Sequence, residues 1–276
     1  MKTTSYTLIL IALALAFAGC KKEKDEPVTT GVYLKKMTKA YNETINPESW
    51  LYFYDKGRLV RITHLEDTIP DESEIYSYNS DGTLNKVEFE RQYGIIGTYT
   101  LFYTNGKVSS IENDQGIYYH DTVQFTYSGD KVTASFGYGS VYAHLNGENQ
   151  IMSLIKPNTE RTDSLVFTWQ EGNVTSIKFY EYYSKNLIHT REFEYDNGIN
   201  YVKAIHYPAE WMFYFSLFNN DNLEYYTNNN CTKFSMWNTG NNPDIFNTTY
   251  PEYSPENYPL KMNTQYYNYE FEYTVE

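Results

Sequence analysis

The sequence predicts an all-β protein, an antiparallel meander of tandem hairpins that curls into a barrel or a strongly curved sheet. Three observations predict this fold. A turn motif recurs about every two dozen residues, the residues beside each turn alternate between apolar and polar, and no stretch after Cys20 has a sustained helical period. Alternation with period two places one set of side chains on a buried face and the other towards water.

Residues 1–19 are expected to be a signal peptide. Lys2 supplies a positive charge, and residues 8–17 form an apolar run shorter than the ~20 residues that a membrane-spanning helix needs. Phe17-Ala18-Gly19-Cys20 resembles the lipobox of bacterial lipoproteins, in which the acylated cysteine becomes the new N-terminus. Cys20 is therefore the expected point of attachment to the membrane. Residues 20–31 are rich in Lys, Asp and Glu and are expected to form a flexible tether.

The tether also contains Lys24-Asp25-Glu26, which is similar to the lysine-and-acid signal that sends Bacteroidota lipoproteins to the cell surface. That similarity implies an outer-membrane lipoprotein that is displayed at the surface in preference to facing the periplasm. The chain has only two cysteines, one of them Cys20, so the sequence predicts no disulfide framework. The stability of the body must come from apolar burial.

Residues 32–276 are expected to be one domain that opens with a strand containing Val32, Leu34 and Met37. Hairpins follow, each with an aromatic residue, a short polar or glycine-bearing turn and an aliphatic anchor. Asn-Gly and Asp-Gly pairs suit such turns because they accept positive φ at little cost. Copies begin at Tyr54, Tyr78, Tyr103, Tyr127, Trp169 and Tyr195, weaker copies lie at 145–147 and 218–223, and the anchors Leu59, Leu84, Val108 and Val132 are 25, 24 and 24 residues apart.

Residues 228–259 interrupt the rhythm and are expected to be loop material, because Asn, Gly and Pro gather there. A last hairpin is expected with Leu260 and Met262 on one arm and residues 266–275 on the other. Together the turns imply well over a dozen strands. Sheets of that length rarely stay open and flat, because twist accumulates and free edges invite pairing.

The segment Tyr54-Asp55-Lys56-Gly57-Arg58-Leu59 resembles a YD repeat, and the other copies are looser versions of it. The lipobox, the degenerate repeats and the Tyr258-Pro259 and Tyr269-Glu270-Phe271-Glu272-Tyr273 segments together resemble a family of Bacteroidota lipoproteins with a porin-like antiparallel β fold. That resemblance implies an architecture and brings no catalytic residue with it. A membrane-spanning barrel stays open as an alternative, although the charges at Glu270 and Glu272 count against it.

Charge and motifs narrow the function. A formal net charge of −13 repels phosphate backbones, so we expect no nucleic-acid partner. The sequence has no Gly-x-Ser-x-Gly elbow, P-loop, dinucleotide fingerprint or His-Glu-x-x-His motif. Its five histidines are too scattered to form a ligand set. We therefore expect no catalytic residue, no metal and no cofactor.

The aromatic content is unusual, with 31 Tyr, 15 Phe and 4 Trp. Planar rings beside Asn and Asp are typical of sugar-binding sites, so the candidate ligand-binding residues are Trp211, Trp237, Tyr250 and Tyr253, in or near the irregular segment. Trp50 and Trp169 adjoin hairpin motifs and are expected to be structural. The leading hypothesis is a non-catalytic envelope lipoprotein, held to the membrane through Cys20, that binds an extracellular glycan or another macromolecule. The alternatives are a scaffold for an envelope protein and, third, a glycoside hydrolase.

Overall fold

The computed structural model describes residues 31–41, 47–116, 120–137, 139–156, 164–181, 184–218, 227–238 and 242–275. The expected signal peptide, Cys20 and nearly all of the tether lie outside these residues. The strands are β1 (Val32–Tyr41), β2 (Glu48–Asp55), β3 (Arg58–Glu66), β4 (Ile69–Tyr78), β5 (Leu84–Arg91), β6 (Gly94–Thr104), β7 (Lys107–Asp114), β8 (His120–Ser128), β9 (Lys131–Phe136), β10 (Gly139–Leu145), β11 (Ile151–Ile155), β12 (Ser164–Gln170), β13 (Asn173–Tyr180), β14 (Leu187–Ile199), β15 (Asn229–Asn238), β16 (Asp244–Asn247), β17 (Thr249–Tyr253), β18 (Pro259–Asn263) and β19 (Tyr267–Val275). A 3₁₀ helix, η1 (Tyr201–Ile205), and an α-helix, α2 (Ala209–Phe218), lie between β14 and β15.

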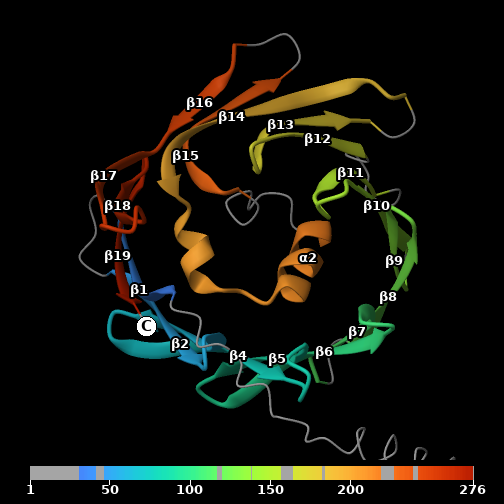
Figure 1. Cartoon of the computed structure of the whole chain (residues 1–276), viewed down its shortest axis with the longest axis horizontal. Helices are drawn as coiled ribbons and strands as arrows, with labels where there is room; N and C mark the ends of the chain where they lie inside the picture. The colour runs from blue at the N-terminus through green and yellow to red at the C-terminus, as the bar shows by residue number, and fades with distance from the viewer. Residues whose placement is uncertain are drawn as a thin grey trace, which may run out of the picture.

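These 19 strands form one antiparallel sheet that is nearly closed into a barrel (Figure 1). Strands β1 to β16 pair in sequence order, and so do β17, β18 and β19. The ring returns on itself where β19 pairs with β1, with Val275 opposite Val32. The all-β meander predicted from the turn spacing is confirmed, and so are the first strand and the last hairpin.

The five strongest turn motifs, from Tyr54 to Trp169, are hairpin turns at one end of the barrel, which we call the turn end. At three of them both central residues have positive φ: 48° and 76° at Lys56 and Gly57, 52° and 74° at Asn105 and Gly106, and 51° and 77° at Glu171 and Gly172. This geometry matches the twist of paired strands, and glycine adopts it without steric cost.

The aliphatic anchors of the repeats face the interior of the barrel. Leu59, Leu84 and Val174 are fully buried, and Val108 and Val132 are nearly so. They form one continuous hydrophobic core with other inward-facing residues of the wall. The spacing of about 24 residues therefore marks the positions at which successive hairpins contribute to the same core.

The aromatic residues of most repeats have a polar role as well. The hydroxyl of Tyr78 donates to the Leu59 carbonyl at 2.7 Å, and that of Tyr103 donates to the Leu84 carbonyl at 2.7 Å. Each therefore bonds to the anchor of the preceding repeat, and burial raises the pKa of Tyr78 to about 12. We call the whole series the aromatic ladder; its other donors are Tyr54 to Leu34, Trp169 to Ile151, Tyr195 to Val174, Tyr250 to Cys231 and Tyr273 to Pro259.

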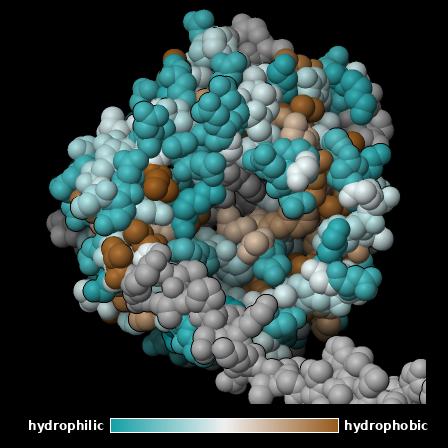
Figure 2. Space-filling model, in the orientation of Figure 1, coloured by the Kyte–Doolittle hydropathy of each residue, from teal (hydrophilic) through white to brown (hydrophobic). Residues whose placement is uncertain are grey.

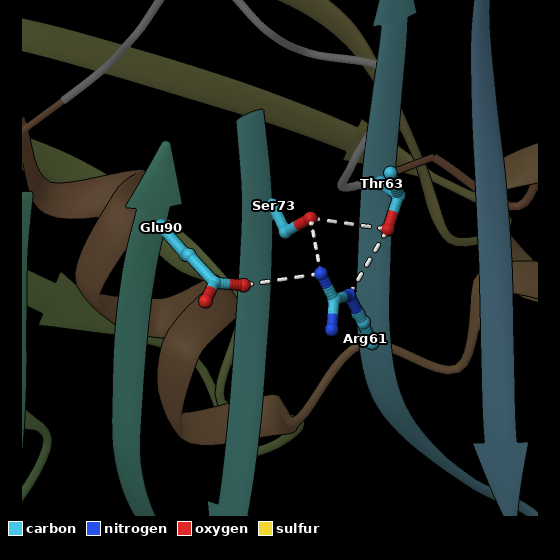
Figure 3. Close-up of polar contacts among 4 residues, drawn as sticks. All are labelled: Arg61, Thr63, Ser73 and Glu90. Atoms are coloured by element: carbon cyan, nitrogen blue, oxygen red, sulfur yellow. Dashed lines mark hydrogen bonds and ion pairs between the residues drawn. The ribbon is translucent and has the colours of Figure 1, made fainter. Parts of the chain in front are cut away.

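The outer face of the wall is polar. On β3 to β5, Arg61 donates to Thr63 at 3.1 Å and to Ser73 at 2.9 Å, and pairs with Glu90 at 3.1 Å (Figure 3). These four side chains alternate with inward-facing residues such as Ile62. The period-two expectation therefore holds along these strands.

The interior of the ring is filled by η1 and α2 (Figure 1). The absence of helix expected after Cys20 is therefore wrong for residues 201–205 and 209–218. Helix α2, with the sequence AEWMFYFSLF, is surrounded by the wall and is apolar on almost every side. A helix of that kind has no amphipathic period for a pattern search to detect. Neither described helix combines the length and apolar character needed to cross a bilayer.

Two other expectations need correction. The motif at Tyr195 lies inside β14 and is not a hairpin turn. Its glycine, Gly198, leaves room for the Tyr253 ring, because a Cβ at that position would lie 2.4 Å from the ring. Residues 228–259 were expected to be loop, but β15 (Asn229–Asn238), β16 (Asp244–Asn247) and β17 (Thr249–Tyr253) lie within them. The side chain of Asn173, on β13, fixes the start of β15, since its Oδ1 accepts from the backbone N–H groups of Asn228 and Asn229 at 2.8 and 3.0 Å. Most of the weak copy at 218–223 lies outside the described residues.

Candidate functional site

The four candidate residues from the sequence do not form one site. Trp211, on α2, is 1% exposed and packs inside the barrel, so it is a core residue and not a loop residue. Trp237, on β15, is 42% exposed. Tyr250 and Tyr253 lie on β17 with ring centroids 6.3 Å apart, and their hydroxyls bond to the Cys231 carbonyl and to Asp196.

A large hollow lies elsewhere, between α2 and the turn end of β6 to β12, and has a volume of about 1130 Å³. We call it the lumen groove. Three consecutive hairpin turns, at residues 105–106, 129–130 and 146–150, border it on one side, and α2 forms the other side. Figure 2 shows hydrophobic side chains inside the ring, framed by hydrophilic ones. Cavities of roughly 300–1,000 Å³ hold most small ligands, so this groove is large enough for an extended one.

Aromatic rings line the groove. Tyr103 and Tyr127 come from successive repeats, Trp169 comes from a later repeat, Phe213 comes from α2, and all four are half-buried. Two of these rings are fixed by the aromatic ladder, because the hydroxyl of Tyr103 and the indole N–H of Trp169 donate to backbone carbonyls at 2.7 and 2.9 Å. A ring held in one rotamer loses little conformational entropy when a ligand stacks on it. Tyr103 and Tyr127 are two strands apart in the sheet, about 10 Å at the usual strand spacing.

Polar groups stand at the edges of the same groove. His144 lies 2.6 Å from Asp130, and this hydrogen bond lowers the pKa of the Asp130 carboxyl. The Lys107 ammonium lies 4.9 Å from the centre of the Tyr127 ring. Burial, and next the nearby charge of Glu210, raise the pKa of Tyr103, so its phenol stays protonated at neutral pH. The groove thus combines flat apolar faces with hydrogen-bonding groups at their rims.

A smaller cavity of about 240 Å³ holds an acidic cluster at the other end of the barrel, and we call it the acidic pocket. Its carboxylates belong to Glu48, Glu72 and Glu74, with Trp50 beside them. Glu48 pairs with Lys39 at 3.2 Å and Glu72 pairs with Arg91 at 2.7 Å. Burial raises the pKa of Glu74, whose carboxylate accepts a hydrogen bond from Tyr76. Among the residues described, no group of three or more His, Cys, Asp or Glu is arranged to hold a metal ion.

Two parts of the lumen groove were not predicted from the sequence. One is α2, whose uniform apolar character hides its period. The other is Trp169, which was expected to be structural because it begins a hairpin. Trp169 is indeed part of the aromatic ladder, but its ring also faces the groove. The available signal was that Trp replaces Tyr at this one repeat position.

No protein-family model matches the sequence, and no curated protein matches it either. Among solved structures, the chain is similar to porin-like proteins from Bacteroides uniformis and Bacteroides vulgatus, each with a TM-score of 0.43. The identities are 12% and 13%, over 88% of this chain and 98% and 99% of those chains. A chain of the TcdB2–TccC3–Cdc42 complex is similar over 80% of this chain and 14% of its own length, with 12% identity and a TM-score of 0.30. Similarity at these TM-scores assigns neither a ligand nor a reaction to this chain.

Proposed function

We propose that this protein is a cell-envelope lipoprotein, anchored through Cys20, that binds an extracellular glycan in the lumen groove without transforming it. The observation that carries the proposal is the row of aromatic rings, Tyr103, Tyr127 and Trp169, along one wall of a cavity of about 1130 Å³. Sugar rings present apolar C–H faces and hydroxyl edges. The groove offers aromatic faces for the first and the amides, carboxylates and His144 at its rim for the second.

Binding is tested by affinity electrophoresis and calorimetry of the mature protein against a panel of polysaccharides. We expect at least one glycan to bind, and Trp169→Ala and Tyr127→Ala to weaken it by roughly tenfold or more, which is about 1.4 kcal/mol each. The matched controls are Trp237→Ala and Tyr142→Ala, since these rings are 42% and 45% exposed and do not line the groove. A protein that binds no glycan, or that loses binding equally in the controls, would contradict the proposal.

Anchoring needs a separate test, because the groove does not depend on it. Cys20→Ala should move the protein from the membrane fraction to the soluble fraction of the producing cell. Cleavage of the wild-type protein by protease added to intact cells would support surface display. Protection from that protease, with cleavage only after the outer membrane is opened, would place the domain in the periplasm instead.

A second candidate function is glycoside hydrolysis, and one observation favours it. The acidic pocket places Glu74, whose pKa burial raises, beside Glu72, which is held in an ion pair with Arg91. Hydrolases use such a pair, with one carboxylic acid as proton donor and one carboxylate as base or nucleophile. Release of reducing ends that Glu74→Gln abolishes would favour this reading, whereas unchanged glycan after long incubation would exclude it for that substrate.

A further inference from the structure

The aromatic rings of the lumen groove occupy equivalent positions in their hairpins. In the register of the sheet each ring residue lies opposite the aliphatic anchor of its own hairpin: Tyr103 opposite Val108, Tyr127 opposite Val132, and Trp169 opposite Val174. The three rings therefore lie at one level of the barrel, next to the turn end, and follow one another around the inside of the wall.

A fourth apolar side chain fills the interval between Tyr127 and Trp169. Leu145 takes the equivalent position in the β10–β11 hairpin, opposite Ile151, and lines the groove as well. We call Tyr103, Tyr127, Leu145 and Trp169 the apolar row; its members stand on β6, β8, β10 and β12, which is every second strand. A sugar unit of a glycan chain is comparable in length to one strand spacing, ~5 Å, so a chain of about six units reaches from one end of the row to the other.

The apolar row is curved. Strands β6 to β12 are seven of the 19 strands of the ring, and they bend around α2 (Figure 1). The row lies on the concave side of this arc, and Met212, Phe213 and Ser216 of α2 line the groove from within. A straight, stiff chain cannot follow a concave wall, so it contacts fewer positions of the row than a chain that bends with it. An α-linked glucose chain bends at every linkage, whereas the β-linked chain of cellulose is extended.

The charges of the groove disfavour an acidic glycan. Among the described residues that line it, Lys107 is the only Lys or Arg, and two carboxylates are present, those of Asp130 and Glu210. The whole chain has a formal net charge of −13. A sugar that bears a carboxylate or a sulfate is therefore repelled, whereas an uncharged sugar is not.

We propose that the lumen groove is selective for an uncharged glycan that bends along its length, of the α-linked glucan type, and that the apolar row contacts about every second sugar of the bound chain. This proposal rests on the glycan binding proposed above and adds the shape and the charge of the chain. The apolar C–H faces of the sugars lie on the row, and their hydroxyl groups face the polar turns and water at the open edge of the groove.

The test compares maltohexaose with cellohexaose, which are built from the same glucose units and differ only in linkage. Each is titrated by calorimetry into the mature lipoprotein in a detergent without a sugar headgroup. We expect maltohexaose to bind about tenfold or more tightly than cellohexaose, and also than maltotriose, which is too short to cover the row. Equal or tighter binding of cellohexaose, no gain from maltotriose to maltohexaose, or no binding of maltohexaose at millimolar concentration would overturn the proposal.

Variants at the two ends of the apolar row test the length dependence. Tyr103→Ala and Trp169→Ala should each reduce the gain in affinity from maltotriose to maltohexaose, because the longer chain loses an end contact. Trp169→Phe lacks the indole N–H but keeps an aromatic face, so it should retain most of the gain. The matched control is Trp237→Ala, which removes a 42% exposed ring outside the groove and should leave the gain unchanged. A gain that survives in both end variants, or that Trp237→Ala also reduces, would refute the role of the row.

A third probe tests the charge of the chain. Maltohexaose that has been oxidised at its primary alcohols to carboxylates should bind at least about tenfold more weakly at low salt, and the difference should narrow as salt rises. Equal binding of the oxidised chain would contradict the selectivity for an uncharged glycan. Tight binding of a straight polysaccharide that requires Trp169 would overturn the bent-chain proposal and leave glycan binding intact, whereas a protein that binds no glycan would overturn both.

Discussion

The arc from β2 to β13 and the segment from β14 to β17 are built in different ways from the same kinds of residue. In the arc, short turns, inward aliphatic anchors and the aromatic ladder recur hairpin after hairpin. In the segment, the period fails: a helix enters the lumen, a motif that resembles a turn lies within a strand, and β16 is only four residues long. The arc makes a regular wall, and the segment fills and modifies it.

That difference locates the cavities. The lumen groove lies where α2 meets the arc, and another cavity, of about 380 Å³, lies within the segment from β14 to β17 and its neighbours β18 and β19. The inner face of the wall packs against itself or against α2, and cavities remain where the surfaces of the wall and the helix do not match in shape. The segment from β14 to β17 therefore borders both cavities, and the arc supplies aromatic rings to the lumen groove.

Removal of the ring that joins the two regions should have the largest effect. Trp211 packs against Tyr99 of the arc and against Tyr214 and Phe215 of its own helix, with centroids 5.0 to 5.5 Å apart. Trp211→Ala should lower the free energy of unfolding by about 3–5 kcal/mol, measured by urea denaturation. The matched control Trp237→Ala removes an exposed indole and should change it by less than about 0.5 kcal/mol. Equal losses would mean that α2 is not anchored through this ring.

The next effect concerns the aromatic ladder where the two regions adjoin. Tyr195, in the irregular segment, donates to the carbonyl of Val174, the last anchor of the arc, at 2.6 Å. Tyr195→Phe leaves the ring and removes the donor, so the free energy of unfolding should fall by about 1–3 kcal/mol. Tyr142→Phe, at a 45% exposed position, should be neutral in the same urea measurement. A neutral Tyr195→Phe would show that the ladder bonds are replaced by water without loss.

The two regions also differ in how far the sequence predicts them. Alternation and glycine-bearing turns are local signals, so the strands of the arc and their inward anchors, such as Leu59 and Leu84, followed from the residues alone. The hairpin turn predicted at Gly198 was wrong because a glycine needed for the close approach of a ring has the same local sequence pattern as a glycine needed for a turn. The prediction that Trp211 binds a ligand was wrong because this residue is buried by the barrel that closes around it. Closure of the barrel is a property of the whole chain and leaves no signal in the neighbouring sequence.

Two Asn-Gly pairs sharpen the comparison within the arc itself. Gly106 has a φ of +74° with open space around it, whereas Gly147, also in open space, is not among the glycines with positive φ. Gly106→Ala should therefore cost about 1–2 kcal/mol through backbone strain alone. Gly147→Ala should be neutral or slightly stabilising, because it reduces the freedom of the unfolded chain. Thermal unfolding of the two variants side by side decides the matter, and equal melting temperatures would refute the turn assignment.

The smallest effect is expected on the outer face of the arc. Arg61 is 42% exposed at its side chain and its partner Glu90 is 40% exposed, so water screens the pair and takes over its hydrogen bonds when it is removed. Arg61→Gln should lower the free energy of unfolding by less than about 1 kcal/mol. This loss should become smaller as the salt concentration rises from about 0.05 to about 0.5 M, because salt screens the ion pair of the wild-type protein. Beneath Arg61, Thr63 and Ser73 keep their mutual hydrogen bond at 3.1 Å, so they stay satisfied. A loss of several kcal/mol that is insensitive to salt would mean that the outer network holds the wall together, and the stability of the arc could then no longer be attributed to its inner face.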